Sequence, residues 1–263
     1  MPIEELENTK NRTLVVIPVY NNERTIKQVI EQCQEFTESV LVVNDGSTDQ
    51  TSKLIEESCP RYIVDLEDNY GKGRAIIEGA RFAKDRGYKY MITLDADGQH
   101  FPSDLPIFLS QIQKNPGTIL IGCRKMNGEG GDIPGSSIFG RKFSNFWVWV
   151  ETGHKLPDTQ SGYRLYPVKS LLHEKWSRSR YDFEIEVIVK NLWRKIPIKS
   201  VPISVFYPKK GSRVSSFRPF MDNLRLTSLH ARLVSINLLN LLTGGMLLAR
   251  FFRWKDRQLL QKE

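Results

Sequence analysis

The sequence has few of the features that mark secreted proteins. It contains three cysteines, Cys33, Cys59 and Cys123, which are odd in number and follow neither a metal-binding nor a disulfide spacing. Residues 1–13 are polar and acidic and contain no apolar signal core. We therefore expect a reducing compartment and a cytoplasmic location.

Two phosphate-binding motifs are also missing. No Gly-x-Gly-x-x-Gly follows the first apolar run, and no Gly-x-x-x-x-Gly-Lys-Ser/Thr occurs anywhere in the chain. Their absence argues against a dinucleotide-binding domain and against a P-loop protein. Gly71-Lys72-Gly73 is a weak phosphate-loop signal, and a flexible turn before a helix explains it equally well.

An uncharged run toward the C-terminal end is short for a membrane span. Residues 233–249 are 17 residues between Arg232 and Arg250, whereas a spanning helix needs about 20 apolar residues. Serine, asparagine, threonine and glycine interrupt the run. We expect a helix in the membrane interface or a short hairpin-like insertion. The alternative is a helix that docks on the body of the protein or in a homodimer.

Acidic residues are scarce toward the C-terminal end. From residue 190 onward the chain has 15 Lys and Arg against three acids, out of totals of 38 and 30, so the first 189 residues carry 23 bases against 27 acids. A basic segment after an acidic body predicts an anionic partner: nucleic acid, a phosphorylated substrate or an anionic membrane surface. The neighbouring apolar run favours the membrane surface over nucleic acid.

What the chain does have is a regular alternation of apolar runs and amphipathic segments. Apolar, β-branched runs predict strands at residues 13–18, 40–43, 62–64, 91–94, 118–124 and 198–207, with another after 164. Helical spacing predicts helices at residues 24–36, 50–58, 73–86, 103–115 and 141–151, and from 183 onward. We expect most aromatic side chains of 141–151 to lie in the core, after a glycine-rich loop at 125–137. This alternation predicts an α/β fold with helices on both faces of a parallel sheet.

Polar side chains gather after three of the expected strands. Asp95, Asp97 and Gln99 follow one of them, and oxygen ligands of this kind suit Mg²⁺ or Mn²⁺ when substrate phosphates complete the shell. Residues 20–23 and 44–49 follow the first two strands. Because ligands of open α/β sheets bind at the carboxyl ends of the strands, we expect the three tips to meet in one cleft. A single Asp-Gly turn at the end of a strand is common and needs no functional explanation. Three loops with acidic residues at one edge of the sheet repel one another unless a cation or a ligand lies between them.

These motifs resemble glycosyltransferase family 2, and within it the dolichyl- and polyprenyl-phosphate sugar synthases. The matching pieces, within residues 13–215, are Val16-Ile17-Pro18-Val19-Tyr20-Asn21-Asn22-Glu23, Val43-Asn44-Asp45-Gly46-Ser47-Thr48-Asp49, Leu94-Asp95-Ala96-Asp97-Gly98-Gln99-His100 and Ser161-Gly162-Tyr163-Arg164. The resemblance implies a GT-A fold, with a mixed, mainly parallel sheet, over residues 1–215. Amphipathic helices at the membrane or in a docking contact would follow over residues 216–263.

The resemblance also implies roles for individual residues. The donor, a UDP- or GDP-linked sugar, would be bound by Pro18, Tyr20, Glu23, Asp45, Asp95, Lys209, Lys210 and Arg213. A Mg²⁺ or Mn²⁺ ion on the donor diphosphate would be held by Asp95, Asp97 and Gln99. Arg124 and Arg141 would lie near the phosphate of a lipid acceptor.

The implied reaction is an inverting transfer of the sugar to a lipid-linked acceptor at the cytoplasmic face of a membrane. An ionised lipid phosphate needs positioning, whereas a hydroxyl of a glycolipid or polysaccharide needs a general base. The candidate bases are Asp158, which we prefer, and Glu184, for which a helix-start charge is the alternative reading. Two rival classes are a non-catalytic scaffold that binds nucleotide or membrane, and a nucleotidyltransferase, which would need a basic glycine-rich motif early in the chain.

Overall fold

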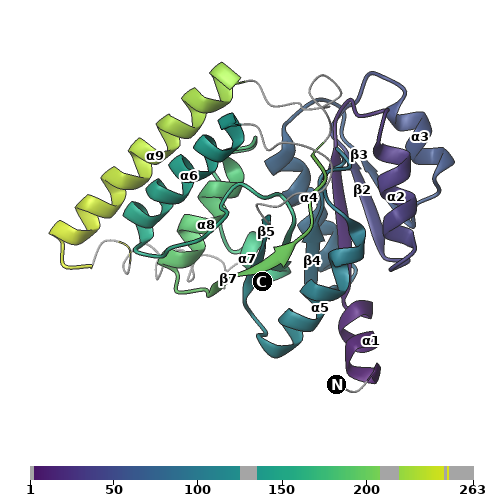
Figure 1. Ribbon diagram of the computed structural model, residues 1–263, viewed down its shortest axis with the longest axis horizontal. Helices are drawn as coiled ribbons and strands as arrows, with labels where there is room; N and C mark the ends of the chain where they lie inside the picture. The colour runs from purple at the N-terminus through teal and green to yellow at the C-terminus, as the bar shows by residue number, and fades with distance from the viewer. Residues whose placement is uncertain (1–2, 125–134, 208–218, 246–247, 249–263) are drawn as a thin grey trace.

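The protein is built on a seven-stranded sheet with the strand order β3-β2-β1-β4-β6-β5-β7 (Figure 1). The computed structural model describes residues 3–124, 135–207, 219–245 and 248. The strands are β1 (Thr13–Val19), β2 (Val40–Asn44), β3 (Tyr62–Asp65), β4 (Tyr90–Thr93), β5 (Ile119–Arg124), β6 (Arg164–Pro167) and β7 (Ile198–Ile203). The helices are α1 (Ile3–Asn11), α2 (Ile26–Gln34), α3 (Thr51–Glu57), α4 (Lys72–Asp85), α5 (Leu105–Lys114), α6 (Gly135–Thr152), α7 (Val168–Leu172), α8 (Phe183–Trp193) and α9 (Pro219–Leu242).

One strand makes the sheet mixed. β6 runs antiparallel to both of its neighbours, β4 and β5. The other neighbouring strands, β1 with β2 and β4, β2 with β3, and β5 with β7, are parallel. The expectation of an α/β fold with a mixed, mainly parallel sheet is therefore confirmed.

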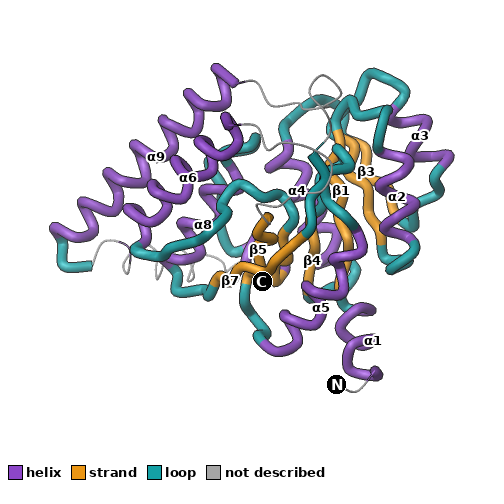
Figure 2. The backbone as a smooth tube through the Cα atoms, in the orientation of Figure 1, coloured by secondary structure: helices purple, strands orange, loops and turns teal. Residues whose placement is uncertain are grey.

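Helices cover both faces of the sheet, as Figure 2 shows. Side chains alternate along β1, so Leu14 and Val16 join the core under α4, α7 and α8, while Val15 and Ile17 join the core under α2, α3 and α5. All seven residues of β1 are buried, because helices lie on both sides of it. The carboxyl ends of the parallel strands are thus the part of the sheet left for a site.

A proline fits inside this central strand for a local reason. Val15 bonds toward β2, since its amide donates to the carbonyl of Ser39, and Val16 faces β4, since its carbonyl accepts the amide of Leu94. Pro18 is on the same side as Val16 but lies beyond Val16–Thr93, the last aligned pair of β1 and β4. Its missing amide therefore leaves no bond to β4 unmade.

The helices differ from the expected ones at four places, and one of these is α7, which the sequence did not predict. The sequence did not predict α1, because this segment is mostly polar and has no apolar stripe. α6 begins at Gly135 rather than 141, so the end of the expected loop is helical; residues 125–134 lie outside the described part. α9 covers residues 219–242, whereas the apolar run predicted a helix over 233–249, and residues 243–245 form a turn. Among the helices that the structure describes, none has the length and hydropathy to cross a bilayer.

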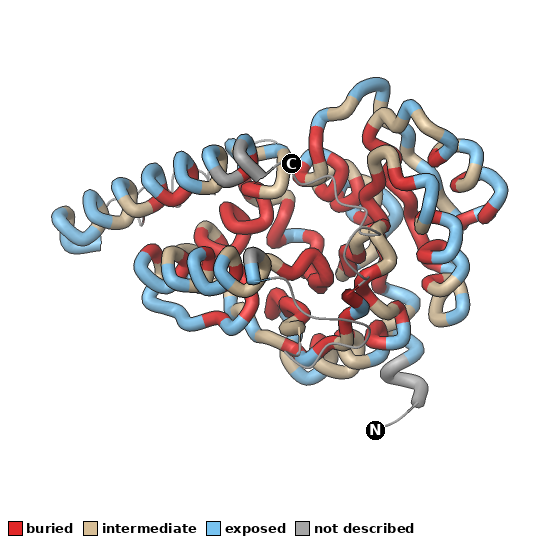
Figure 3. The backbone as a smooth tube through the Cα atoms, turned by 45° about the horizontal axis from the view of Figure 1, so that its top comes forward, coloured by how far each residue is buried: buried red, intermediate tan, exposed pale blue. Residues whose placement is uncertain are grey.

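The expectation that the aromatic residues of α6 are mostly core is wrong. Phe143, Phe146 and Trp149 are 40%, 51% and 43% exposed. α6 lies between α8 and α9, and α9 is mostly exposed along its length (Figure 3). Glu151 of α6 and His230 of α9 are buried together, with the Nδ1 of the histidine 2.7 Å from the carboxylate. The helix thus buries a narrow stripe and leaves aromatic rings on its outer face.

Candidate functional site

The three strand tips meet, as the sequence predicts. The side-chain oxygen of Asn21, after β1, accepts the backbone amide of Thr48, after β2, at 2.8 Å. The hydroxyl of Thr25 donates to the carbonyl of Ala96, after β4, at 2.6 Å. Hydrogen bonds of Asn21 and Thr25, after β1, thus hold the loops after β2 and β4 together at one edge of the sheet.

Four residues expected to line a nucleotide pocket lie along this edge. Pro18 is buried in β1, and Tyr20 is half-buried directly after it. Glu23 is exposed, and its carboxylate accepts the amide of Gln50 at 3.1 Å. Asp45 is 2% exposed at the end of β2. The edge therefore brings the four residues together, although Pro18 can contribute little more than backbone.

Asp45 fixes the loop that leads into α4. Its two oxygens accept the backbone amides of Tyr70 and Gly71, at 2.9 and 2.8 Å. Burial raises the pKa of Asp45 in spite of these bonds and of nearby Arg180. Gly71 has φ +101°, a conformation that glycine adopts without strain. Asp45 therefore shapes the neighbouring loop.

The first aspartate of the Asp-Ala-Asp motif is paired with the lysine of Gly71-Lys72-Gly73, which the sequence marked only as a weak phosphate-loop signal. Lys72, the first residue of α4, places its Nζ 2.6 Å from Asp95 and 2.9 Å from Glu184 of α8. Burial raises the pKa of Asp95, but the charge and hydrogen bond of Lys72 and the neighbouring charges, including that of Arg164, together outweigh burial, and the net shift is downward. Burial alone lowers the pKa of Lys72, and the two carboxylates reverse that shift and raise it. Lys72 and Asp95 are therefore both charged at pH 7.

A second cation, Arg164, contacts this cluster through Glu184. It is fully buried at the start of β6 and donates to the carbonyls of Ser161, Glu184 and Thr159 at 2.7, 2.8 and 2.9 Å. Its Nε is 3.7 Å from the carboxylate of Glu184. The Ser-Gly-Tyr-Arg motif was the signal for it, but the motif alone does not say what the arginine contacts.

Asp97 and Gln99 lie in the turn after β4. An oxygen of Asp97 accepts the amide of Gln99 at 3.0 Å, and the carboxylate is only partly buried. Gln99 is 6% exposed, and its carbonyl accepts the amide of Phe206 at 2.8 Å. Next to it, burial lowers the pKa of His100 to about 4, so this imidazole is neutral at pH 7.

The two arginines expected near an acceptor phosphate share one carboxylate. Arg124 makes a two-point contact with Asp158, from Nε at 2.7 Å and from Nη2 at 2.8 Å. Arg141 of α6 approaches the same carboxylate at 3.6 Å. Asp158 is fully buried, which raises its pKa, but the hydrogen bonds and charge of Arg124 lower it below its usual value. The structure thus brings Arg124, Arg141 and Asp158 together, while Lys209, Lys210 and Arg213 lie outside the described residues.

The turn after β4 has too few ligands to hold a divalent ion alone, so a bound substrate would have to supply the remaining ligands. The described part of the chain holds no group of three His, Cys, Asp or Glu side chains that could bind a metal. Asp97 and Asp95 supply carboxylate oxygens and Gln99 an amide oxygen. Mg²⁺ in proteins commonly takes one or two carboxylates, substrate phosphates and water. The residues present therefore fit a metal that arrives with a phosphorylated substrate.

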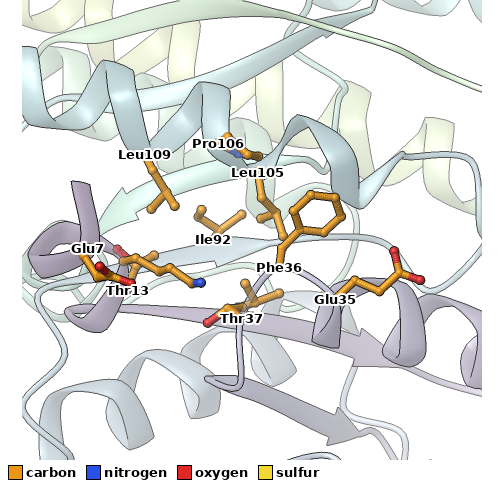
Figure 4. A pocket seen from close by; sticks show the side chains of 11 residues that line it. Glu7, Thr13, Glu35, Phe36, Thr37, Ile92, Leu105, Pro106 and Leu109 are labelled. Atoms are coloured by element: carbon orange, nitrogen blue, oxygen red, sulfur yellow. The ribbon is translucent and has the colours of Figure 1, made fainter. Parts of the chain in front are cut away.

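A separate cavity of about 320 Å³ lies away from this edge (Figure 4). Its lining includes Thr13, at the amino end of β1, and Leu105 and Leu109 of α5. The floor is apolar, with Val15 and Ile92 from the sheet. Since it opens at the opposite end of β1 from Tyr20, it is not part of the candidate site.

Comparisons with known proteins place the chain among sugar transferases. The sequence profile of Glycosyl transferase family 2 matches residues 14–173. The UDP-N-acetylglucosamine–dolichyl-phosphate N-acetylglucosaminyltransferase of Methanococcus voltae is 29% identical over 213 residues, which cover 73% of this chain and 85% of the relative. The human (Homo sapiens) dolichyl-phosphate beta-glucosyltransferase is 30% identical over 238 residues, which cover 77% and 69%.

Solved structures agree on the fold. Glucosyl-3-phosphoglycerate synthase from Mycobacterium tuberculosis in complex with UDP has a TM-score of 0.68 at 19% identity, covering 89% of this chain and 85% of that chain. The same enzyme with Mn²⁺, UDP-glucose and phosphoglyceric acid has a TM-score of 0.65 at 21% identity, covering 91% and 83%. The chain therefore belongs to glycosyltransferase family 2 and has the GT-A fold.

Proposed function

We propose that the protein transfers a sugar, with inversion, from a nucleotide-diphospho-sugar to a lipid phosphate. The observation that carries the proposal is the pairing of two sites at one sheet edge: a carboxylate-bearing turn at Asp97 and an arginine pair at Arg124 and Arg141. Family membership supports the donor class, and the names of both relatives include dolichyl phosphate. A polyprenyl phosphate is thus the proposed acceptor.

On the donor side, the proposed metal ligands are Asp95, Asp97 and Gln99. When bound, Mg²⁺ or Mn²⁺ would neutralise charge that develops on the leaving diphosphate. The fold neighbour that contains Mn²⁺ and UDP-glucose supports a divalent ion. Asp45 would act indirectly, since its carboxylate organises the loop before α4.

On the acceptor side, the charges favour a phosphate over a hydroxyl. A hydroxyl acceptor needs a general base, and both candidates are already paired: Asp158 with Arg124 and Arg141, and Glu184 with Lys72. A lipid phosphate is ionised at pH 7 and needs orientation only. Asp158 is then a positioning residue that aligns the two guanidinium groups. A non-catalytic scaffold would have no use for this arrangement.

A lipid acceptor requires contact with a membrane surface, and α6 and α9 supply apolar side chains for it. The exposed ones on α6 are Phe139, Phe143, Phe146, Trp149 and Val150, and those on α9 include Leu224, Leu238, Leu239, Leu241 and Leu242. The two helices lie side by side (Figure 1). Large exposed apolar areas mark interaction sites, and basic residues near apolar helices favour anionic lipid.

The first test measures nucleotide binding. Calorimetry with UDP and with GDP, in Mn²⁺ and in EDTA, compares the wild type with Asp97→Ala and with Asp85→Ala, an exposed aspartate of α4. We expect metal-dependent micromolar binding of one nucleotide, lost in Asp97→Ala and kept in the control. Transfer from the matching sugar nucleotide to polyprenyl phosphate, but not to polyprenol, should follow. Binding of neither nucleotide, or binding indifferent to Asp97, would contradict the proposal.

Membrane association is tested separately by sedimentation with vesicles. We expect the protein to bind vesicles that contain an anionic phospholipid and to bind less after Phe139→Ser with Leu242→Ser, which are 71% and 76% exposed. Ile63→Ser, at the far edge of the sheet and 38% exposed, is the matched control. Equal vesicle binding by all three proteins would exclude these helices as the membrane contact.

A further inference from the structure

Lys72 occupies a position where a metal site would ordinarily carry negative charge. Its Nζ lies between Asp95, at 2.6 Å, and Glu184, at 2.9 Å, and its side chain is 13% exposed. The Asp95 side chain is 26% exposed and the Glu184 side chain 6%. The aspartate that opens the Asp-Ala-Asp motif is thus neutralised by a mostly buried lysine of the protein itself.

The space for this lysine is made by a glycine. A Cβ added to Gly162 would overlap the Asp95 carboxylate and would come within 2.6 Å of Lys72 Nζ. The carbonyl of Gly162 is held by the hydroxyl of Thr93 at 2.9 Å, which fixes the backbone there. Sheet and helix therefore build a slot for the lysine, and the contact is not an incidental surface pair.

The acidic residues of the candidate site attract a metal ion only weakly when no substrate is bound, because cations of the protein already neutralise them. Asp95 already has a cation at hydrogen-bond distance, Asp158 has Arg124 and Arg141, and no three-ligand cluster exists in the described residues. A divalent ion that approaches Asp95 without a substrate also approaches Lys72, which is 2.6 Å from that carboxylate and repels the ion at short range. A nucleoside diphosphate changes the balance, because it brings negative charge and oxygen ligands of its own.

We propose that Lys72 is an internal counter-cation that prevents tight metal binding until the nucleotide diphosphate is present. The inference rests on the proposed function for the identity of the diphosphate. Metal and nucleotide then bind cooperatively, and by linkage each raises the affinity for the other by the same factor. The protein so avoids holding a metal in an empty site, and the lysine, a positioning residue, sets the size of that coupling.

The test measures binding of Mn²⁺ alone by electron paramagnetic resonance of the free ion, with the full chain and no nucleotide. The variants are Lys72→Met and, as a control, Lys84→Met, an exposed lysine on the same helix. We expect weak binding in the wild type and the control, and at least tenfold tighter binding in Lys72→Met. Repeating the titration with saturating UDP or GDP should tighten Mn²⁺ binding at least tenfold in the wild type, and by a smaller factor in Lys72→Met.

Removal of the lysine leaves Asp95 without its hydrogen-bonded cation and Glu184 with the more distant Arg164, at 3.7 Å, so a second variant controls for misfolding. Lys72→Met with Glu184→Gln removes one charge of each sign and leaves Asp95 unneutralised; it should bind Mn²⁺ as tightly as the single variant. Unchanged or weaker Mn²⁺ binding in whichever of these variants keeps the wild-type circular dichroism would overturn the inference. Absence of nucleotide binding in the wild type would instead count against the proposed function, and the nucleotide-free titration would still decide the role of Lys72.

Discussion

Replacement of Asp158 by alanine removes a carboxylate that neutralises both Arg124 and Arg141. Asp158 is fully buried and accepts two hydrogen bonds from Arg124, at 2.7 and 2.8 Å. Loss of one partner from a buried ion pair costs about 3–5 kcal/mol, because the remaining charge is left desolvated. The arginine side chains are 14% and 9% exposed, so some water reaches them and we expect about 3 kcal/mol.

For a chain of this size, that loss lowers the melting temperature by about 6–12 °C. Urea unfolding followed by circular dichroism measures the free energy of unfolding directly. Asp85→Ala, on the exposed end of α4, should change it by less than about 0.5 kcal/mol. Asp158→Asn keeps one hydrogen-bond acceptor, so its loss in free energy of unfolding should lie between those of Asp158→Ala and Asp85→Ala.

The same variants separate a positioning role from a general base. If Asp158 positions the arginines, Asp158→Asn should lose stability and raise the KM for lipid phosphate, while the KM for the sugar nucleotide changes little. A general base would give a different kinetic pattern: unchanged KM values and a kcat lowered by orders of magnitude. A free energy of unfolding within about 1 kcal/mol of the wild type in Asp158→Ala would refute the argument from buried charge.

Three further outcomes follow from packing and burial. Gly162→Ala should lower both the melting temperature and the affinity for nucleotide measured by calorimetry, because the added methyl overlaps the carboxylate of Asp95. Burial raises the pKa of Cys33 to about 12, so this thiol should react with a disulfide reagent at pH 8 only after unfolding in urea; reaction at the same rate in the native protein would contradict its burial. Glu151→Leu should destabilise the protein more than Glu151→Leu with His230→Leu, since the single change leaves a buried imidazole unpaired; urea unfolding of both variants checks the order.

Much of the sheet could be read from the sequence because its central strands are buried on both faces. Such strands are continuous apolar runs, and the runs at 13–18 and 40–43 lie within one residue of the observed β1 and β2. The meeting of the strand tips also followed, since parallel strands present their carboxyl ends at one edge. Asn21, Thr48 and Thr25 now show the contacts that join those tips.

The environment of the side chains of α6 was harder to predict, because its apolar residues do not lie on a single face of the helix. The aromatic rings of α6 look like a core stripe, yet Phe146 and Trp149 are about half exposed. The core instead receives Val148 from this helix. An apolar side chain is expected to avoid water, but it can do so either in the core of the protein or against the surface of a partner. The sequence does not distinguish these two environments.

The Lys72 cluster could not be predicted, because it depends on the direction of a strand. Lys72 and Glu184 are 112 residues apart in sequence, and neither lies in an expected metal motif. What joins them is β6, which enters antiparallel between β4 and β5 with Arg164 opposite Thr93. In an antiparallel pair, two steps forward on one strand match two steps back on the other, so that register carries Gly162 to the position of Asp95. A parallel β6 would have put a different residue there and left no slot for the lysine. The motifs Asp-Ala-Asp and Ser-Gly-Tyr-Arg, which look independent in the sequence, are thus two sides of one site, and a substitution at Gly162 should act on metal and nucleotide binding through Asp95 rather than by direct contact.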